Sequence, residues 1–484
     1  MTDQRIPPSL QHLIIEHDKV VKHIPKFGVV AFGGMAGVAL AKEVPAAISR
    51  SGRDFNLTVL TGGTTTSVFE EGLSSIRVAR RYPAVSGSLS RDMANRETIS
   101  VADYWLSEYS RWIRFGVIPH VKKIDVAVVE STGVDENGII PSLSVDAVPA
   151  MVDAADKVVL EVNLSKPVMY GLHDIYLPKD SEPVPIRNVL DRVGEPVVRC
   201  PSNKLAAIIV TDKPESGAGG YGAVSPVELK IAGHITEVLS AAVGEKSLTR
   251  FYTLQPGAGP LASALLDRID FSGLRVWSEA VSVDWVHHVG GKVSAISSSC
   301  IYVLRGQEKL LEMVYSELSS LKDSVVLRPY EITNRAEMIS RMSLISIQQA
   351  IEVDIYGNAN ITHIGGNIHN GVGGSGDFTR NAYLTVLALP STTSNGKLSR
   401  IVPICSHVDI PEHDVDFLVT ENGWADLRGL SPRERARVII DNCVHDRFRD
   451  MLAEYFEKAC GVGGHEPVSW RHAVQFREMM ELAS

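Results

Sequence analysis

The sequence predicts an α/β protein made of two open α/β domains with largely parallel sheets. Short apolar runs rich in β-branched residues recur at wide intervals, and most lack the polar alternation of a strand with one solvated face. In the first half these runs lie at 27–32, 57–60, 125–130, 157–162 and 205–210. Helical patterns separate them, for instance at 40–51 and 144–156. Strand alternating with helix is typical of a mainly parallel sheet.

The second half of the chain repeats this alternation. Its predicted strands lie at 274–283, 292–298, 400–405 and 415–423, and its amphipathic helices include 431–443 and 446–460. A chain of 484 residues suits two or three domains, each with a substantial core. We therefore expect two halves of similar architecture, although no short repeat relates their sequences.

The two halves are separated by a stretch that reads as a linker or long loop. Gly, Pro and Ser crowd together in residues 211–226. A helix is predicted to begin directly afterwards, because Ser225 is a suitable N-cap, a proline follows it, and Glu228 lies three residues beyond the cap. The expected domains are residues 1–215 and residues 216–484.

Composition excludes several functional classes. The net charge is −9, which argues against a nucleic-acid-binding surface over much of the chain. There is no run of about 18 or more apolar residues, so no membrane span is expected. The N-terminal segment carries acidic residues and lacks the apolar core of a signal peptide, and the five cysteines form no CxxC pair. We expect a cytoplasmic protein with free thiols.

A glycine-rich segment is the strongest local signal for a functional site. The sequence NGVGGSGDFTRNAYL, residues 370–384, holds four glycines within six residues and leads into a predicted helix. They are Gly371, Gly373, Gly374 and Gly376. A simple tight turn with positive φ explains one or two glycines. Four favour backbone N–H groups aimed at an anion or at an oxyanion that develops during a reaction.

Three familiar glycine motifs do not fit this segment. A P-loop requires a lysine followed by Ser or Thr, which is missing. The nucleophile elbow of hydrolases requires a second glycine where Asp377 stands. The G-x-G-x-x-G pattern is present literally, but the acidic partner expected about 20 residues later in a dinucleotide-binding fold is missing.

Longer motifs resemble a known family. NGVGGSGDFTRNAYL, SHVDIPEHDVDFLVTENGWADLRGLSPRERARVIIDNC and LRPYEITN are similar to the acetyl-CoA hydrolase/transferase family. This is a branch of the class I CoA-transferases that includes succinyl-CoA:acetate and propionyl-CoA:succinate CoA-transferases. The resemblance covers nearly the whole chain, is strongest from about 325 to 460, and extends to 33–48 and 60–73. It implies two CoA-transferase-type domains and an enzyme that moves CoA between a small acyl-CoA and a free carboxylate.

The resemblance also implies the nucleophile. Its register places the reactive glutamate at Glu279, within LRVWSEAVSVDWVHHVGGKVSAISSS. Apolar neighbours make an unpaired carboxylate unusual there. Glu331, in RPYEITN, is a rival that local sequence alone does not exclude. The implied chemistry is ping-pong, through an acyl–glutamyl anhydride and a glutamyl–CoA thioester.

The residues around the nucleophile follow from the same resemblance. The oxyanion donors are expected to be the backbone of Gly374, the side chain of Asn334 and the backbone of Ala258. An alternative or additional role for Asn334 is N-cap of a helix over 335–342. The residues expected to contact CoA or substrate are Gln255, Gly257, Gly259, Gly371, Gly373, Gly376, Gly34 and Met35. For Gln255, Gly257 and Gly259 a simple turn is the alternative.

The first glycine turn departs from the usual family pattern. Gly34-Met35-Ala36 stands where relatives commonly have Gly-Phe-Thr, and Ala39-Leu40-Ala41 replaces a Gly-Tyr-Pro or Gly-Ser-Pro stretch. The identity of the acid therefore stays open among acetate, propionate, succinate and less usual acids.

Two other functions remain open at this point: an acyl-CoA hydrolase that uses the same Glu279, and a non-catalytic acyl-CoA-binding protein. The expected partners are acyl-CoA and small carboxylic acids, with neither nucleic acid nor membrane, and the resemblance implies a homodimer. No permanently bound cofactor is expected. No metal is expected either, because the pairs His363/His369 and His407/His413 lack the spacing of H-E-x-x-H.

Overall fold

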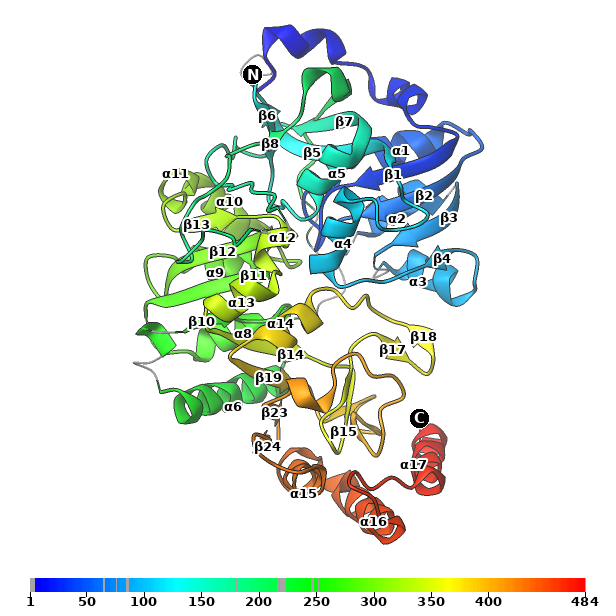
Figure 1. Cartoon of the computed structure of the whole chain (residues 1–484), viewed down its shortest axis with the longest axis vertical. Helices are drawn as coiled ribbons and strands as arrows, with labels where there is room; N and C mark the ends of the chain where they lie inside the picture. The colour runs from blue at the N-terminus through cyan, green and yellow to red at the C-terminus, as the bar shows by residue number, and fades with distance from the viewer. Residues whose placement is uncertain are drawn as a thin grey trace. The chain divides into compact units, whose positions relative to one another are not determined.

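The computed structural model describes residues 5–63, 66–74, 76–83, 87–179, 182–215, 217, 223–244, 248–250, 252–270 and 272–483 (Figure 1). Contacts between residues divide the chain into two compact units. The first contains Met1–Tyr221, Ser272–Met342 and Ile368–Asp377, and the second contains Gly222–Phe271, Ser343–Asn367 and Phe378–Ser484. The chain therefore leaves the first unit and returns to it twice. The two-domain division at residue 215 stays a prediction, and much of the predicted linker, residues 216 and 218–222, lies outside the described residues.

The first unit is built on a sheet that has nine strands in the described part of the chain, in the order β4-β3-β2-β1-β5-β6-β8, with β7 paired to β5 and β9 paired to β7. Its strands are β1 (Phe27–Phe32), β2 (Asn56–Thr61), β3 (Arg77–Tyr82), β4 (Ser100–Val101), β5 (Ile124–Val134), β6 (Gly138–Pro141), β7 (Ala155–Asn163), β8 (Val198–Arg199) and β9 (Leu205–Thr211). The pairs around β1, β2, β5, β7 and β9 are parallel, whereas β6 pairs antiparallel with β5 and β8.

Helices cover this sheet because its strands are apolar on both faces. They are α1 (Glu43–Arg50), α2 (Ser67–Ser74), α3 (Ser88–Asn95), α4 (Leu106–Arg114), α5 (Val148–Ala154) and the 3₁₀ turns η2 (Pro8–Leu13), η3 (His17–His23) and η4 (Ser202–Lys204). One continuous core joins strand residues such as Val30 and Val59 to Ile48 of α1 and Phe69 of α2. Burial of these side chains is the main stabilising term for the unit.

A second, smaller set of strands in the first unit carries the predicted nucleophile. It comprises β11 (Leu274–Ser282), β12 (Val293–Tyr302) and β13 (Val325–Leu327), which pair in parallel in the order β13-β12-β11. The helices that accompany it are α9 (Val283–His287), α10 (Glu308–Ser316), α11 (Leu318–Leu321), α12 (Tyr330–Thr333) and α13 (Ala336–Arg341). The fully buried Trp277 and Trp285 anchor this layer.

The second unit contains the strands β10 (Thr253–Gln255), β14 (Leu344–Gln349), β19 (Leu384–Ala388), β23 (Phe417–Thr420) and β24 (Gly423–Asp426), in that order. The first four are parallel and β24 is antiparallel. Its helices include α6 (Pro226–Ala242), α8 (Pro260–Arg268), α15 (Pro432–Cys443), α16 (Asp446–Val462) and α17 (Trp470–Ala483). The chain also forms α14 (Ser375–Asn381), η5 (Glu412–Asp414) and the short strands β15 (Glu352–Asp354), β16 (Ala359–Asn360), β17 (His363–Ile364), β18 (Asn367–Ile368), β20 (Thr392–Thr393), β21 (Leu398–Ser399) and β22 (Ile401–Val402).

The predicted fold class, α/β with largely parallel sheets, is confirmed. The helix after the predicted linker begins with a capping box, in which Glu228 N–H donates to Ser225 Oγ and Ser225 N–H donates to Glu228 Oε2. The strand predicted at 400–405 is wrong in extent: β22 covers only Ile401–Val402, because Pro403 follows and has no N–H for a ladder. No helix in the described ranges combines the length and apolar character needed to span a bilayer.

Candidate active site

The predicted nucleophile, Glu279, lies near the end of β11. Parallel pairing places its neighbour Ala280 opposite Cys300 of β12, and Ser298 Oγ donates to the Glu279 carbonyl oxygen at 3.2 Å. The Trp277 indole N–H donates to the Thr333 carbonyl oxygen at 2.8 Å. This bond ties β11 to the short helix α12. The residue after Thr333 is thereby held beside the nucleophile.

Three of the predicted catalytic residues meet within the first unit. Asn334 Nδ2 donates to Glu279 Oε2 at 2.7 Å, and the Gly374 backbone N–H donates to the same carboxylate. A Cβ added to Gly374 would overlap both Glu279 Oε2 and Asn334 Nδ2. The glycine is therefore required by lack of space, and its N–H reaches the carboxylate only because no side chain intervenes.

The electrostatics of Glu279 are unusual for a carboxylate. Burial, with a smaller contribution from the negative charge of Asp377, raises the pKa of Glu279 to about 7. The hydrogen bonds from Asn334 and Gly374 act in the opposite direction. The residue as a whole nevertheless keeps some exposed surface. A poorly hydrated carboxylate that a ligand can still reach is suited to nucleophilic attack.

The rival glutamate, Glu331, is buried and paired with an arginine. It is 4% exposed, and its Oε1 accepts hydrogen bonds from Arg114 Nε at 3.1 Å and from Ser110 Oγ at 3.3 Å. The guanidinium of Arg114 also pairs with Oε2. A carboxylate neutralised by a bidentate arginine is a weak nucleophile. The geometry favours Glu279, whose carboxylate receives hydrogen bonds from neutral groups.

The suggested N-cap role of Asn334 is wrong. Helix α13 begins at Ala336 with Arg335 in the N-cap position and without a side-chain cap, whereas Asn334 follows α12 as its C-cap residue. Its Oδ1 instead accepts a hydrogen bond from Thr333 Oγ1 at 2.9 Å. The other end of the amide faces two carboxylate oxygens, Glu279 Oε2 and Asp377 Oδ2, which identifies it as the donor Nδ2.

The other glycines of the loop have separate structural roles. Gly373 has a φ of 58°, in the left-handed region, and an added Cβ would lie 3.9 Å from Glu279 Oε1. Gly376 lies in the first turn of α14, where a Cβ would overlap the Trp105 ring. Gly371 lies in the irregular stretch before the turn. The expectation that the glycines lead into a helix is confirmed.

The sequence reasoning missed the segment 103–107, which holds this loop. The Val372 N–H donates to Asp103 Oδ2 at 2.6 Å, and the Leu106 N–H donates to the Gly373 carbonyl at 3.3 Å. An acidic residue and a tryptophan just before a helix were the available signal. That signal does not identify a partner about 270 residues away in the chain.

The first glycine turn, residues 33–41, is held by a buried aspartate. Gly34 has a φ of 98°, and its N–H donates to Asp146 Oδ2 at 2.9 Å. Met35 is 4% exposed, and its sulfur accepts a hydrogen bond from the Tyr330 hydroxyl at 2.7 Å. Burial raises the pKa of Asp146 to about 6. Gly34 and Met35 thus belong to the packed interior of the first unit.

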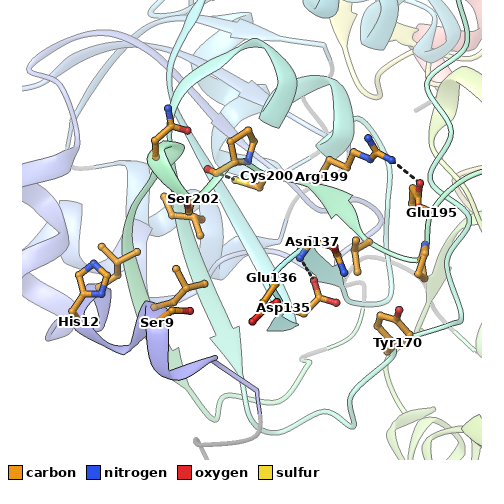
Figure 2. Close-up of a pocket in the computed structure, with 17 residues that line it drawn as sticks. Ser9, His12, Asp135, Glu136, Asn137, Tyr170, Glu195, Arg199, Cys200 and Ser202 are labelled. Atoms are coloured by element: carbon orange, nitrogen blue, oxygen red, sulfur yellow. Dashed lines mark hydrogen bonds and ion pairs between the residues drawn. The ribbon is translucent and has the colours of Figure 1, made fainter.

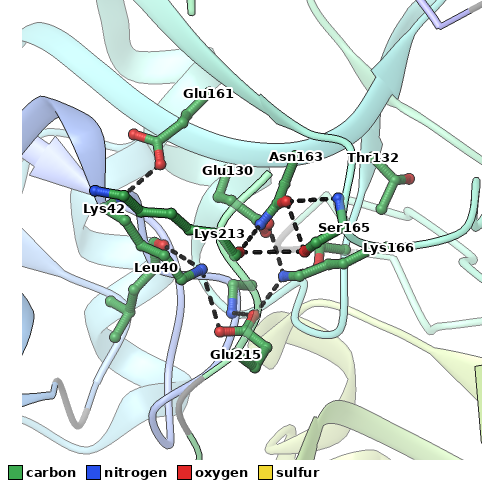
Figure 3. A network of polar contacts seen from close by, with 12 residues as sticks. Leu40, Lys42, Glu130, Thr132, Glu161, Asn163, Ser165, Lys166, Lys213 and Glu215 are labelled. Carbon is green, nitrogen blue, oxygen red and sulfur yellow. Dashed lines mark hydrogen bonds and ion pairs between the residues drawn. The ribbon is translucent and has the colours of Figure 1, made fainter. Parts of the chain in front are cut away.

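A network of buried ion pairs supports the far end of this turn (Figure 3). The Ala39 N–H donates to Glu215 Oε1 at 2.9 Å, and Glu215 pairs with Lys166 and, at 3.2 Å, with Lys42. The Glu161 carboxylate accepts hydrogen bonds from the first backbone N–H groups of α1. The lysines lower the pKa of Glu215 to about 2 against the effect of burial. The turn is therefore anchored by charges that are paired with one another.

In the second unit, Gln255 ends strand β10. It is 6% exposed, and its side-chain oxygen accepts hydrogen bonds from Ser346 Oγ at 2.9 Å and Gln348 Nε2 at 2.8 Å. The side-chain carbonyl of Gln255 therefore links β10 to β14 by hydrogen bonds. Its expected contact with CoA stays a prediction.

The turn after β10 has the conformation of a glycine-dependent loop. Gly257 and Gly259 have φ values of 77° and 74°, and an added Cβ at Gly257 would lie 2.8 Å from the Ile347 carbonyl oxygen. The Ala258 carbonyl oxygen accepts a hydrogen bond from Gln349 Nε2 at 2.6 Å. Gly259 precedes α8 as its N-cap. The predicted oxyanion role of Ala258 and the predicted CoA contacts of its neighbours stay predictions.

A groove of about 1040 Å³ in the first unit contains none of the predicted site residues (Figure 2). Two pairs of its polar groups bond to each other. Arg199 pairs with Glu195 at 2.7 Å, and the Asn137 N–H donates to Asp135 Oδ1 at 2.7 Å. Burial raises the pKa of Cys200 to about 11, so its thiol stays protonated at neutral pH. The Cys200 thiol is therefore not an activated nucleophile.

The histidines singled out in the sequence form no ligand set in the part of the chain that the structure describes. The rings of His363 and His407 lie 4.2 Å apart, and His407 Nε2 lies 3.0 Å from Asp409 Oδ1. Across the described residues, no group of three or more His, Cys, Asp or Glu side chains is placed to hold a metal ion.

Comparison with known protein families gives two matches. Residues 9–212 match the model of the acetyl-CoA hydrolase/transferase N-terminal domain, and residues 306–456 match that of the C-terminal domain. Together the two matches cover most of the chain.

Curated relatives match over nearly their whole length. A succinyl-CoA:acetate CoA-transferase of Clostridium kluyveri is 37% identical, over 98% of this chain and 90% of that protein. A propanoyl-CoA:succinate CoA transferase of Escherichia coli is 34% identical, over 91% and 92%. An acetyl-CoA hydrolase of Neurospora crassa is also 34% identical, over 95% and 92%.

Solved structures share the fold at lower identity. RipA from Yersinia pestis has a TM-score of 0.71 and 19% identity, over 94% of this chain and 98% of that one. A 4-hydroxybutyrate CoA-transferase from Porphyromonas gingivalis has a TM-score of 0.61 and 22% identity, over the same shares. These likenesses confirm the expected CoA-transferase type of fold.

Proposed function

The chain belongs to the acetyl-CoA hydrolase/transferase family and is an enzyme of the CoA-transferase family, and we propose that it moves CoA from a small acyl-CoA to a free carboxylate through Glu279. The observation that carries this proposal is the convergence of Asn334 Nδ2 and the Gly374 N–H on the Glu279 carboxylate. The names of two relatives support acetate, propionate or succinate as the acids.

The proposed reaction begins with attack of the Glu279 carboxylate on the thioester carbonyl. The tetrahedral adduct expels CoA thiolate and leaves an acyl–glutamyl anhydride. The thiolate then attacks the glutamyl carbonyl, which releases the donor acid as its carboxylate and leaves a glutamyl–CoA thioester. The acceptor carboxylate runs both steps in reverse. Thioester energy is retained throughout, and the nucleophile is a carboxylate because a hydroxyl or a thiol could not form the anhydride.

The two donors suit the step at the glutamyl carbon. When the thiolate attacks, the glutamyl oxygen that accepts from Asn334 becomes an oxyanion and keeps this donor, while the Gly374 N–H donates to the same carboxyl group. Loss of one such donor typically costs about 2.7–4 kcal/mol in the transition state. The family resemblance supplies the Ala258 N–H as a further donor in this proposal.

The protonation state of Glu279 sets the pH range of the proposed reaction. With a pKa of about 7 in the free enzyme, the nucleophilic carboxylate is present mainly above pH 7. The value of kcat/KM should therefore fall as the pH drops through about 7, because the protonated acid cannot attack.

The remaining assignments in the proposal concern binding. Backbone of the glycine loop (Gly371, Gly373, Gly376), of the first turn (Gly34, Met35) and of the β10–α8 turn (Gln255, Gly257, Gly259) would contact acyl-CoA. CoA thioesters enter as substrates rather than as a permanently bound cofactor. The family resemblance supports a homodimer, and the five cysteines without a CxxC pair support a cytoplasmic location.

A hydrolase is the second candidate function. Acetyl-CoA hydrolases occur among the relatives at a similar level of identity. Water would then attack the anhydride or the glutamyl thioester formed at the same Glu279. Loss of acetyl-CoA should depend on added succinate for a transferase and be independent of it for a hydrolase. The non-catalytic alternative is not supported, because the family is one of enzymes.

The decisive experiment is peptide mass spectrometry after incubation with acetyl-CoA, propionyl-CoA or succinyl-CoA. We expect a CoA-sized adduct on the peptide that contains Glu279, released by hydroxylamine and missing in Glu279→Ala. Glu279→Asp is the matched control for folding, because it keeps the charge. An adduct on the peptide that contains Glu331 would overturn the assignment.

A further inference from the structure

The glycine loop is held in place by contacts with residues 103–107, the segment in which helix α4 begins. Three of its contacts are to backbone: Asp103 Oδ2 accepts from Val372 N–H, Leu106 N–H donates to Gly373, and Trp105 fills the space beside Gly376. All of them lie within the first unit. The conformation of the loop therefore depends on residues that have no place in the proposed chemistry.

The fourth contact, between Ser107 and Asp377, connects this segment to the nucleophile through Asn334. Ser107 Oγ donates to Asp377 Oδ1 at 2.6 Å, and the Ser107 N–H donates to Asp377 Oδ2 at 3.2 Å. The same Oδ2 accepts from Asn334 Nδ2 at 3.1 Å. Because Nδ2 carries two protons, one can be directed at Asp377 while the other is directed at Glu279 Oε2, 2.7 Å away.

We propose that Asp377, held by Ser107, is a positioning residue that aims the Asn334 amide at the reacting carboxyl group of Glu279. This inference rests on the proposed function and extends it to two residues that do not touch the reacting atoms. Asp377 is 7% exposed and Asn334 is 1% exposed, so neither can exchange its partner for bulk water.

The amide of Asn334 is constrained at both ends. Thr333 Oγ1 donates to its Oδ1, and Asp377 accepts from its Nδ2. Without the acceptor at Asp377, one N–H would be buried and unsatisfied, and the amide would rotate to find another partner. A donor that has rotated by some tens of degrees no longer meets the oxyanion, since hydrogen bonds weaken steeply away from linearity.

Asp377 also contributes charge to the site. The titratable groups that face Glu279 include Asp377 in α14, Cys300 in β12 and Tyr330 in α12, and Glu108 of α4 acts on Asp377. The backbone N–H of Ser107, in the first turn of α4, favours the ionised form of Asp377, whereas burial raises the pKa of Asp377 to about 6. Two neighbouring carboxylates repel each other, and acylation of Glu279 removes one of the charges.

The test measures steady-state kinetics and pH profiles of three variants in the full-length enzyme, with acetyl-CoA and succinate. Asp377→Ala should lower kcat by about 10²-fold with little change in KM, as expected for a displaced oxyanion donor. Ser107→Ala should lower kcat by about 10-fold. Asp377→Asn keeps an acceptor for Asn334 and should lose less activity than Asp377→Ala.

The pH profile separates positioning from general structural damage. Asp377→Asn removes the charge that raises the pKa of Glu279, so the acidic limb of kcat/KM should move to lower pH. Ser110→Ala is the matched control on the same helix, because Ser110 donates to Glu331 instead. It should leave kcat and the acidic limb unchanged.

Unchanged kcat in Asp377→Ala together with an unmoved acidic limb in Asp377→Asn would overturn the inference. Asp377→Ala is uninformative if it does not fold. In that case the inference would be overturned by an unmoved acidic limb of kcat/KM in Asp377→Asn together with wild-type kcat in Ser107→Ala. The glutamyl–CoA adduct of the wild type separates this result from a failure of the proposed function. When the adduct forms and the variants behave as wild type, only the positioning role is wrong; when no adduct forms on Glu279, the proposed function itself is wrong.

Discussion

The glycine loop and the first glycine turn both bend the backbone sharply, but for different physical reasons. In the loop, Gly374 is needed because a Cβ would overlap the Glu279 carboxylate and the Asn334 amide. In the turn, two residues with side chains, Ala36 and Ala39, adopt φ values of 49° and 55°. The loop is therefore limited by space beside a reactive group. The turn carries conformational strain that its anchors must offset.

Glycine content alone therefore does not measure how closely a backbone approaches a reacting group. The alanines of the turn occupy left-handed conformations because Asp146 and Glu215 hold the flanking N–H groups. The loop has no comparable freedom to accept a methyl group at Gly374. Substitutions in the turn should act on stability, and substitutions at Gly374 should act on turnover.

The largest effect is expected from the charges that anchor the turn. Lys166→Ala should lower the free energy of unfolding by about 3–5 kcal/mol, because Glu130 would stay buried without its cation and Glu215 would keep only Lys42. Urea denaturation followed by circular dichroism measures the change. Lys123→Ala is the control, since Lys123 pairs with Asp156 on the surface and should leave the midpoint unchanged. Equal midpoints for both variants would show that the network does not anchor the turn.

The next effect distinguishes two neighbouring glycines of the loop. Gly374→Ala should weaken transition-state binding by about 2.7–4 kcal/mol, seen as a loss of kcat, with a smaller effect on the melting temperature. Gly373→Ala should instead destabilise the fold by about 1–2 kcal/mol, because φ there is 58° while the added methyl group has room. Steady-state kinetics and thermal melts of both variants test the contrast. Full transferase activity in Gly374→Ala would mean that the loop is only a tight turn with no catalytic role.

The smallest effect is expected from relief of strain in the turn. Ala36→Gly should raise the free energy of unfolding by up to about 1 kcal/mol, because glycine adopts a φ of 49° without the penalty of a Cβ. Ala47→Gly, in the middle of α1, is the control and should lower it by about 1 kcal/mol. Thermal melts compare the two. Similar destabilisation by both would mean that Ala36 is not strained.

Much of the fold could be predicted from local patterns. The predicted strand at 27–32 coincides with β1, the run at 205–210 lies within β9, and the capping box at Ser225 forms as expected. Each of these features depends on residues a few positions apart, because burial of a strand face or satisfaction of a helix end is decided locally. The predicted extent of the strand at 400–405 was wrong for a local reason too, because the run contains a proline.

The candidate site was predictable only in part. Residue types and motif resemblance pointed to Glu279, Asn334 and Gly374, and the structure brings these three together. Local sequence did not separate Glu279 from Glu331, because both are single glutamates near apolar residues. The difference lies in their partners: an arginine from α4 neutralises Glu331, and a neutral amide donates to Glu279.

The sequence was sufficient to predict the α/β class, the positions of the main strands and the family whose chemistry requires a carboxylate. It did not predict that Ser107 and Asp377, 270 residues apart, meet beside Asn334, or that Asn334 orients an amide rather than capping a helix. These two kinds of feature differ in the distance along the chain over which their interactions act. Periodicity and capping act over a few residues, whereas the aim of a single N–H bond depends on how α4, α12 and the glycine loop pack around one carboxylate.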